Sequence, residues 1–75
     1  MNIREIFAQN LRAVRRDKGL SQEELAHRAE LDRTYISALE RNVYNPTIDV
    51  VGRLAEALDV EPATLLQRTT GEDEV

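Results

Sequence analysis

The stretch "SQEELAHRAELDRTYISALERN", residues 21–42, contains two short helical patterns separated by only three or four residues. Ser21 is followed three positions later by Glu24, a capping box that marks the start of the first pattern. Asp32 is an N-cap for the second pattern, and Asn42 suits a left-handed residue at its end. This stretch therefore predicts two capped helices joined by a tight corner.

The chain before this stretch has the apolar spacing of one more helix. Its apolar residues recur at steps of four, four and three, at Ile3, Phe7, Leu11 and Val14. Gly19 is a natural C-cap, and the cations of "RRDK" before it oppose the negative end of the helix dipole. We therefore expect a first helix that ends close to Gly19.

The chain after the stretch predicts two further helices. Thr47 caps a fourth helix whose inner side is formed by Ile48, Val51, Leu54, Ala55 and Leu58. Pro62 suits the first turn of a short fifth helix that ends near Arg68. We predict a compact, all-α, five-helix domain over residues 1–68 and an acidic, flexible tail over residues 69–75.

Composition narrows the class of protein. A chain of 75 residues is one small domain, and the absence of cysteine excludes disulfides and thiolate metal sites. No apolar run is long enough to cross a bilayer, and "MNIREIFAQN" has charges where a signal peptide needs apolar residues. We expect a cytoplasmic protein that does not bind membranes.

The net charge of −4 is mild evidence against a nucleic-acid partner, but its distribution weakens that objection. Residues 1–58 contain nine Lys/Arg and nine Asp/Glu, whereas residues 59–75 contain one Arg and five Asp/Glu. Phosphate binding needs a local basic patch rather than a basic chain. The acidic end need not face the partner.

The corner itself suits a helix-turn-helix. Ala26 is small enough for two helices to cross closely, and Ile36 is placed to insert beneath it. This spacing lets one helix brace on the DNA backbone while the next enters the major groove. Helical hairpins of unrelated function also have small residues where the helices cross, so the spacing alone does not separate a DNA-binding helix-turn-helix from such a hairpin.

The segment "GLSQEELAHRAELDRTYISALERNVYNPTIDVVGRLAEALDV", residues 19–60, resembles the phage-repressor and Cro-type (XRE) helix-turn-helix family. The match extends over about residues 8–66, and "LDRTYISALERN" is similar to the controller proteins of restriction–modification systems. The resemblance implies a lambda-repressor-like domain with the motif at helices two and three. It implies a transcriptional regulator, not an enzyme, that binds double-stranded DNA as a homodimer on a roughly palindromic operator without a cofactor.

The resemblance also implies roles for individual positions. The positions that face bases in the family are Arg33, Thr34 and Ser37. The positions that contact the DNA backbone are Gln22, Tyr35, Arg41, Asn42 and Asn45. Arg15 and Glu40 match an ion pair that joins the first helix to the third, and we expect it to fix the orientation of the recognition helix.

The chain departs from the family at three places, one of which is Ala38, which supplies no hydrogen bond where some relatives read a base. The family usually has glycine at the corner, where this chain has Glu30, and a positive φ there would cost about 1 kcal/mol. After the recognition helix the family often has glycine and basic residues, where this chain has "NVYN". That difference predicts weak binding per monomer or more reliance on dimerisation.

The roles of a few other residues follow less directly from the pattern. His27 is the only histidine, so we expect a solvated surface residue and no metal site. Leu65 and Leu66 are adjacent, so a single helical face cannot bury both well, and we expect one to pack on the fourth helix and the other to be exposed or at a dimer interface. We favour a dimer interface for this pair, the alternative being that both lie in a wide core groove. Arg12 and Arg16 are either phosphate contacts or simply the charged face of the first helix.

The function also has an alternative from another class. A protein-interaction module of the same fold, such as an antitoxin or an anti-repressor partner, would suit the acidic tail and the net charge. If the chain is instead an activating regulator, an acidic surface is a possible contact for RNA polymerase. Salt dependence of DNA binding separates the two classes, because only DNA binding requires a steep negative dependence.

Overall fold

The computed structural model of the protein describes residues 2–68. Over these residues the chain forms helices and connecting turns and no strand. The helices are α1 (Ile3–Asp17), α2 (Gln22–Ala29), α3 (Arg33–Glu40), α4 (Ile48–Leu58) and a 3₁₀ helix, η1 (Pro62–Leu66). The predicted all-helical fold is confirmed over this range, while the tail predicted at 69–75 lies outside the described residues.

The fifth helix was predicted wrongly. Pro62–Leu66 forms a five-residue 3₁₀ helix, and the backbone is extended again at Gln67, before Arg68. A segment this short gains too few hydrogen bonds to offset α-helix nucleation, and a single 3₁₀ turn is its usual form. The described part of the chain therefore has four α-helices and a 3₁₀ turn rather than five helices.

The starts of the helices follow the capping signals of the sequence. At α2, the Ser21 hydroxyl accepts a hydrogen bond from the Glu24 N–H at 3.0 Å, and the Glu24 carboxylate accepts from the Ser21 N–H at 2.8 Å. Asp32 and Thr47 accept from backbone amides in the first turns of α3 and α4. These bonds satisfy amides that have no partner within their own helix.

Among residues 2–68, three residues other than glycine have a left-handed backbone just after a helix. They are Glu30 with φ of 58°, Asn42 with φ of 61° and Asp59 with φ of 59°. The positive φ considered for Glu30 and the left-handed stop expected at Asn42 are both present. The corner between α2 and α3 therefore carries a conformation that glycine would adopt at lower cost.

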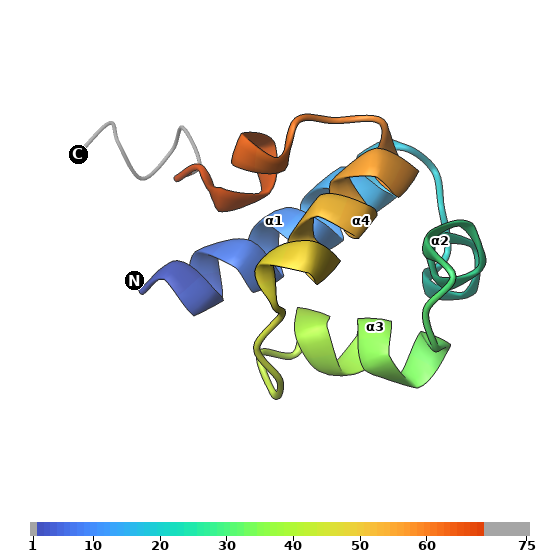
Figure 1. Ribbon diagram of the computed structural model, residues 1–75, viewed down its shortest axis with the longest axis horizontal. Coiled ribbons are helices and arrows are strands. Elements are labelled where there is room, and N and C mark those ends of the chain that lie inside the picture. Colours follow the sequence, from blue (N-terminus) through green and yellow to red (C-terminus); the bar gives the residue numbers. More distant parts are fainter. Residues whose placement is uncertain (1, 69–75) are drawn as a thin grey trace.

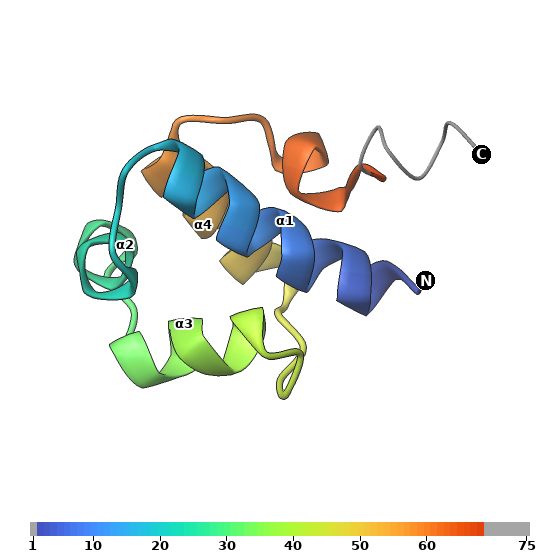
Figure 2. The same ribbon diagram turned by 180° about the vertical axis from the view of Figure 1, so that it is seen from behind.

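The core lies where the helices converge (Figure 1). α1 packs against η1 and α3, α2 against α3 and α4, and α4 against η1. The largest fully buried side chains are Leu11, Leu25, Ile36, Leu39, Leu54, Leu58 and Leu65. Views from the front and from behind both place α3 along one edge of the domain, so that one side of it faces the core and the other faces solvent (Figures 1 and 2).

Two apolar residues assigned to inner faces are exposed instead. Ile3 is 56% exposed and Ile48 is 82% exposed. Both are the first residues of their helices, so their side chains project past the part of the helix that its neighbours cover. The apolar spacing was correct for the middle of each helix and wrong at these ends.

Candidate nucleic-acid interface

The turn between α2 and α3 holds the two helices at a defined angle. Ala26 and Ile36 are both buried in the shared core, with 4% and 0% exposure. The Glu30 N–H donates to the His27 carbonyl at 3.2 Å, and the Leu31 N–H donates to the Ala26 carbonyl at 2.9 Å. Core packing and these turn hydrogen bonds together set the position of α3 against α2.

The outer side of α3 carries the residues that the sequence assigned to base contacts. Arg33 and Thr34, in its first turn, are exposed, and Ser37 is partly buried. Arg41, which was assigned to a backbone contact, donates from its Nε to the Ser37 hydroxyl at 3.3 Å, so these two side chains form a pair on one face. The structure thus brings Ser37 and Arg41 together and leaves Arg33 and Thr34 open to solvent.

The inner side of α3 ends in a buried ion pair. Arg15 Nε donates to Glu40 Oε2 at 2.6 Å, and Arg15 Nη2 donates to Glu40 Oε1 at 3.0 Å. Arg15 Nη1 also donates to the Leu20 carbonyl at 2.8 Å, and the Glu40 side chain has no exposed surface. One carboxylate therefore connects α3 to α1, and the guanidinium connects both to the turn before α2.

Two more residues reach the same carboxylate. Gln22 Nε2 donates to Glu40 Oε1 at 3.0 Å, and Arg12 Nε lies 3.6 Å from that oxygen. Gln22 was assigned to a phosphate contact, and its amide nitrogen keeps a second N–H for that purpose. Arg12 lies in α1 and was considered either as a phosphate contact or as part of the charged face of that helix, and the structure places it beside this carboxylate as well.

The network changes the acidity of its two central groups. Burial raises the pKa of the Glu40 carboxyl, but hydrogen bonds from Arg15 and Gln22 and the charges of Arg15 and Arg12 outweigh it. The pKa of Glu40 is consequently below its ordinary value. The hydrogen bond to Glu40 raises the pKa of Arg15 against the effect of burial. Both groups are therefore charged at neutral pH.

The flank after α3 carries the remaining backbone-contact candidates. Tyr35 is partly buried, and its ring centroid lies 6.2 Å from that of Tyr44 with the planes tilted by 40°. Asn42 and Asn45 are exposed, and Asn45 Oδ1 accepts from Arg4 Nη1 at 3.3 Å. Sequence reasoning missed Tyr44 and Arg4, because Tyr44, in the loop, contacts Tyr35 of α3, and Arg4 of α1 contacts Asn45 of the loop.

A groove with apolar walls lies beside the first turns of α1 and α4. It is lined by Ile3, Arg4, Phe7, Asn45, Pro46, Ile48, Val51 and Leu66. Leu66 is 38% exposed and borders this groove, whereas Leu65 is fully buried in the core. The assignment of Leu65 to a dimer interface was wrong, because its side chain is already covered within one subunit.

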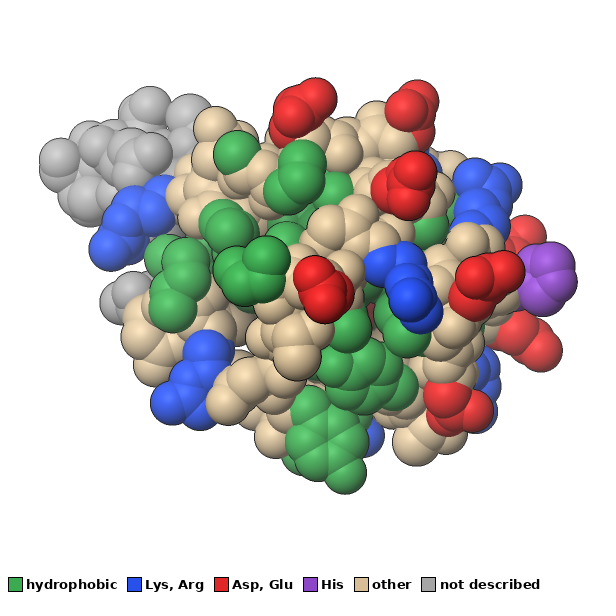
Figure 3. Space-filling view, viewed as in Figure 1, with side chains coloured by type: hydrophobic (Ala, Val, Ile, Leu, Met, Phe, Trp, Pro, Cys, Tyr) green, Lys and Arg blue, Asp and Glu red, His purple; other side chains and the backbone are tan. Residues whose placement is uncertain are grey.

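Apolar side chains gather on the same part of the surface, with basic side chains beside them (Figure 3). Asn10, which sequence reasoning did not select, holds the end of η1 in place next to it. Its buried amide donates to the Leu65 carbonyl at 3.1 Å and to the Gln67 carbonyl at 2.6 Å. The available signal was a polar residue on the otherwise apolar stripe of the first helix.

His27 lies exposed on α2, as expected of a surface residue. Within residues 2–68 no three His, Cys, Asp or Glu side chains are grouped to hold a metal ion. The helices of this range are also too short or too polar to span a membrane.

Comparison with known proteins adds to this geometry. The helix-turn-helix family profile matches residues 11–65. The chain belongs to the helix-turn-helix family. This confirms the resemblance seen in residues 19–60.

The relatives of this helix-turn-helix protein include controller proteins and transcriptional regulators. Control protein C.BamHI of Bacillus amyloliquefaciens is 44% identical over 70 residues, covering 92% of this chain and 86% of that protein. The crystal structure of the hypothetical transcription factor NHTF from Neisseria has a TM-score of 0.90 at 40% identity, covering 97% of this chain and 84% of the other. The controller protein C.Esp1396I, solved as a tetramer with its natural 35-base-pair operator, has a TM-score of 0.80 at 34% identity, covering 87% and 86% of the two chains.

Proposed function

We propose that this helix-turn-helix protein is a sequence-specific, DNA-binding transcriptional regulator that acts as a homodimer on a roughly palindromic operator. The observation that carries the proposal is the contrast between the two sides of α3. Its inner side is packed and hydrogen-bonded within the domain, whereas Arg33, Thr34 and Arg41 stand exposed on its outer side. A helix held from behind, with polar groups in front, meets the requirement for reading a major groove.

The exposed residues of the first turn of α3 would contact bases. Arg33 presents a guanidinium that can donate to guanine O6 and N7 together, a contact worth about 1–3 kcal/mol of discrimination. Thr34 is placed to contact a thymine methyl group or a phosphate, and Ser37 follows one turn later on the same side. These three side chains would determine sequence preference.

A second set of residues would position the domain on the backbone. Gln22 lies at the start of α2, where free amide groups and the helix dipole favour a phosphate. Tyr35, Arg41, Asn42 and Asn45 would contact the strand beside α3. Contacts of this kind set register and affinity but carry no sequence information directly.

The homodimer would form through the apolar groove rather than through Leu65. Ile3, Ile48 and Leu66 are exposed apolar side chains that border this one groove, and a second copy would cover them. Two-fold pairing would place the two α3 helices in successive major grooves about 34 Å apart. The similar protein C.Esp1396I was solved as a tetramer in complex with its operator, which supports assembly of more than one copy on DNA.

The regulatory role that suits these features is that of a repressor or a controller protein, including control of its own operon. No enzymatic activity and no cofactor are part of the proposal. Such a regulator works in the compartment that contains the DNA, in agreement with the cytoplasmic location expected from the sequence. Contact with RNA polymerase stays a prediction.

The proposal is tested by selecting duplexes from a random library and measuring their binding by gel shift at two salt concentrations. The expected result is a palindrome with half-site centres near one helical turn apart, bound less tightly as salt rises. Recovery of no preferred sequence by folded protein would overturn the proposal. A protein-interaction module of the same fold would then be the better description.

The dimer is tested separately by sedimentation equilibrium. Ile48→Gln should shift the chain toward monomer because it places an amide in the apolar contact. Val43→Gln is a matched control, since Val43 is an exposed apolar residue outside the groove. Dimerisation of equal strength in both variants would exclude this surface as the interface.

A further inference from the structure

The loop that follows the recognition helix is poor in positive charge. Of residues 41–47, "RNVYNPT", only Arg41 is basic, and its Nε is hydrogen-bonded back to Ser37 on α3. Its other polar side chains, those of Asn42, Tyr44, Asn45 and Thr47, carry no charge. A DNA strand that passes this flank would meet little charge from the loop itself.

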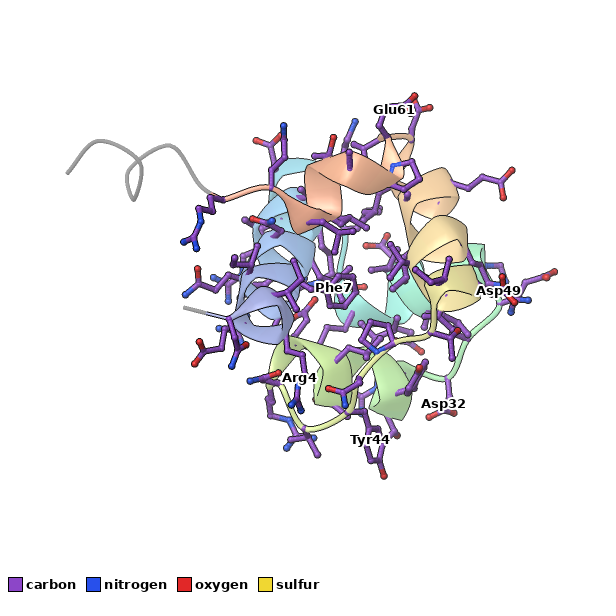
Figure 4. The ribbon with its side chains drawn as sticks, turned by 60° about the vertical axis from the view of Figure 1, so that its left-hand side comes forward. Arg4, Phe7, Asp32, Tyr44, Asp49 and Glu61 are labelled. Atoms are coloured by element: carbon purple, nitrogen blue, oxygen red, sulfur yellow. The ribbon has the colours of Figure 1, made fainter. Side chains whose placement is uncertain are left out.

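The fold brings a cation to this flank from the other end of the chain. Arg4, in the first turn of α1, extends toward the loop that carries Tyr44 (Figure 4). Its Nη1 donates to Asn45 Oδ1 at 3.3 Å, across 41 positions of sequence. Both side chains are exposed, so the pair lies on the surface beside α3.

The charge of Arg4 is not used within the domain. Among residues 2–68 no carboxylate forms an ion pair with it. The adjacent Glu5 instead accepts the Asn2 N–H at 3.0 Å as part of the capping box of α1. A cation in the first turn of a helix also opposes the helix dipole, so the positive charge of Arg4 is not favoured by its place in α1.

The hydrogen bond to Arg4 also orients the amide of Asn45. Because Asn45 Oδ1 accepts from the guanidinium, its Nδ2 is left as a donor toward solvent. Arg4 keeps further N–H groups in a planar fork, the geometry that suits a phosphate. Two donor groups from distant parts of the chain therefore converge on one small area.

The geometry points to Arg4 and Asn45 as a joint binding site for one DNA backbone phosphate beside the recognition helix. Arg4 supplies the charge that the loop lacks, and Asn45 supplies a second donor. This inference rests on the proposed DNA-binding function and adds to it a contact from α1. The contact is independent of base sequence, because phosphates are the same at every step of the duplex.

The test measures DNA affinity by fluorescence anisotropy at several salt concentrations, on a selected duplex and on an unrelated duplex of equal length. Arg4→Gln should weaken binding to both duplexes several-fold and reduce the slope of log K against log salt by about 0.9 for each bound subunit. Arg53→Gln is the matched control, because it removes the same charge from an exposed site on α4. The control should leave the slope unchanged.

Two further measurements separate this role from others. Thermal unfolding of Arg4→Gln should occur close to the wild-type temperature, because loss of the exposed hydrogen bond to Asn45 and removal of a cation from the helix start have small, opposite effects. Asn45→Ala combined with Arg4→Gln should weaken binding by less than the product of the two single effects, because both act on one phosphate. Strictly multiplicative effects would overturn the joint site.

The opposing outcomes are distinguishable. An unchanged salt slope in Arg4→Gln, with wild-type DNA binding intact, would overturn this inference alone. A loss of dimerisation in Arg4→Gln by sedimentation equilibrium would overturn it in favour of a contact with the second subunit, because Arg4 also borders the apolar groove. Wild-type protein that binds neither duplex would overturn the proposed function as well.

Discussion

The two sides of α3 differ in how their polar groups are satisfied. On the inner side, the buried Glu40 carboxylate accepts hydrogen bonds from Arg15 and Gln22. On the outer side, the side chains of Arg33 and Thr34 make no hydrogen bond within residues 2–68. Hydrogen bonds on the inner side hold this helix in place, whereas the polar groups on its outer side are available to a ligand.

Glu40→Gln should remove the buried ion pair on the inner side of α3, and we expect it to lower the free energy of unfolding more than the other variants. Removing one partner of a buried pair leaves Arg15 buried without its counter-charge, which should lower the free energy of unfolding by about 3 kcal/mol. Denaturant unfolding followed by circular dichroism measures this, with the exposed Glu23→Gln as control. Equal midpoints for the two variants would show that the ion pair does not hold α3.

Arg33→Ala should break the outer side and leave the inner side intact. We expect a loss of about 1–3 kcal/mol of discrimination at one base pair, with unfolding free energy changed by less than about 0.5 kcal/mol. Binding to a set of duplexes that differ by single base pairs from the selected site measures it. A variant that keeps the full preference would remove Arg33 from the set of base contacts.

Low pH should lower the free energy of unfolding in part by protonating Glu40 on the inner side of α3. The pKa of Glu40 is lowered in the folded state, so its contribution to stability is complete above its unfolded pKa of about 4.3 and is lost as the pH falls through the lower folded value. Unfolding free energy measured from pH 7 downward should therefore fall less steeply in Glu40→Gln than in the wild type. Because Glu24 titrates in both proteins, with its pKa lowered by hydrogen bonds from Ser21, the comparison isolates Glu40. Identical pH profiles would contradict the assignment.

Glu30→Gly should relieve backbone strain in the turn between α2 and α3, and we expect its main effect, on the free energy of unfolding, to be smaller than the main effects of Glu40→Gln and Arg33→Ala. Glycine adopts φ near 58° without steric cost, so the variant should gain up to about 1 kcal/mol of stability. Glu56→Gly, in the last turn of α4, should instead lose up to about as much, because glycine is a poor helix former. Destabilisation by both substitutions would mean that the Glu30 side chain makes a contribution that offsets its backbone strain.

The helix starts were predictable because capping acts over three residues. Ser21 and Glu24 bond to each other, and Asp32 and Thr47 bond to amides of the turns that they begin. Such bonds need no information from the rest of the fold. The outer side of α3 was predictable for a similar reason, since Ile36 and Leu39 define the inner side and the helical period assigns the remainder.

The burial of individual apolar residues was predicted wrongly near the ends of helices, where the neighbouring helices no longer cover them. Periodicity indicates which way Ile3, Ile48 and Leu65 point but not how far the packing partner extends. Ile3 and Ile48 lie beyond that extent and are exposed, whereas Leu65 lies within it and is buried. A five-residue segment such as Pro62–Leu66 likewise shows too short a pattern to separate an α-helix from a 3₁₀ turn.

The sequence by itself determined the helical class, the N-caps of α2, α3 and α4, the place of the corner between α2 and α3, and the set of polar residues on α3. Only the tertiary structure decided which distant groups meet: Gln22 with Glu40, Asn10 with the Leu65 carbonyl, and Arg4 with Asn45. These pairs are separated by 18, 55 and 41 positions. A local propensity extends over a few residues of chain, whereas contacts between distant residues exist only after the core has packed and brought them within hydrogen-bond distance.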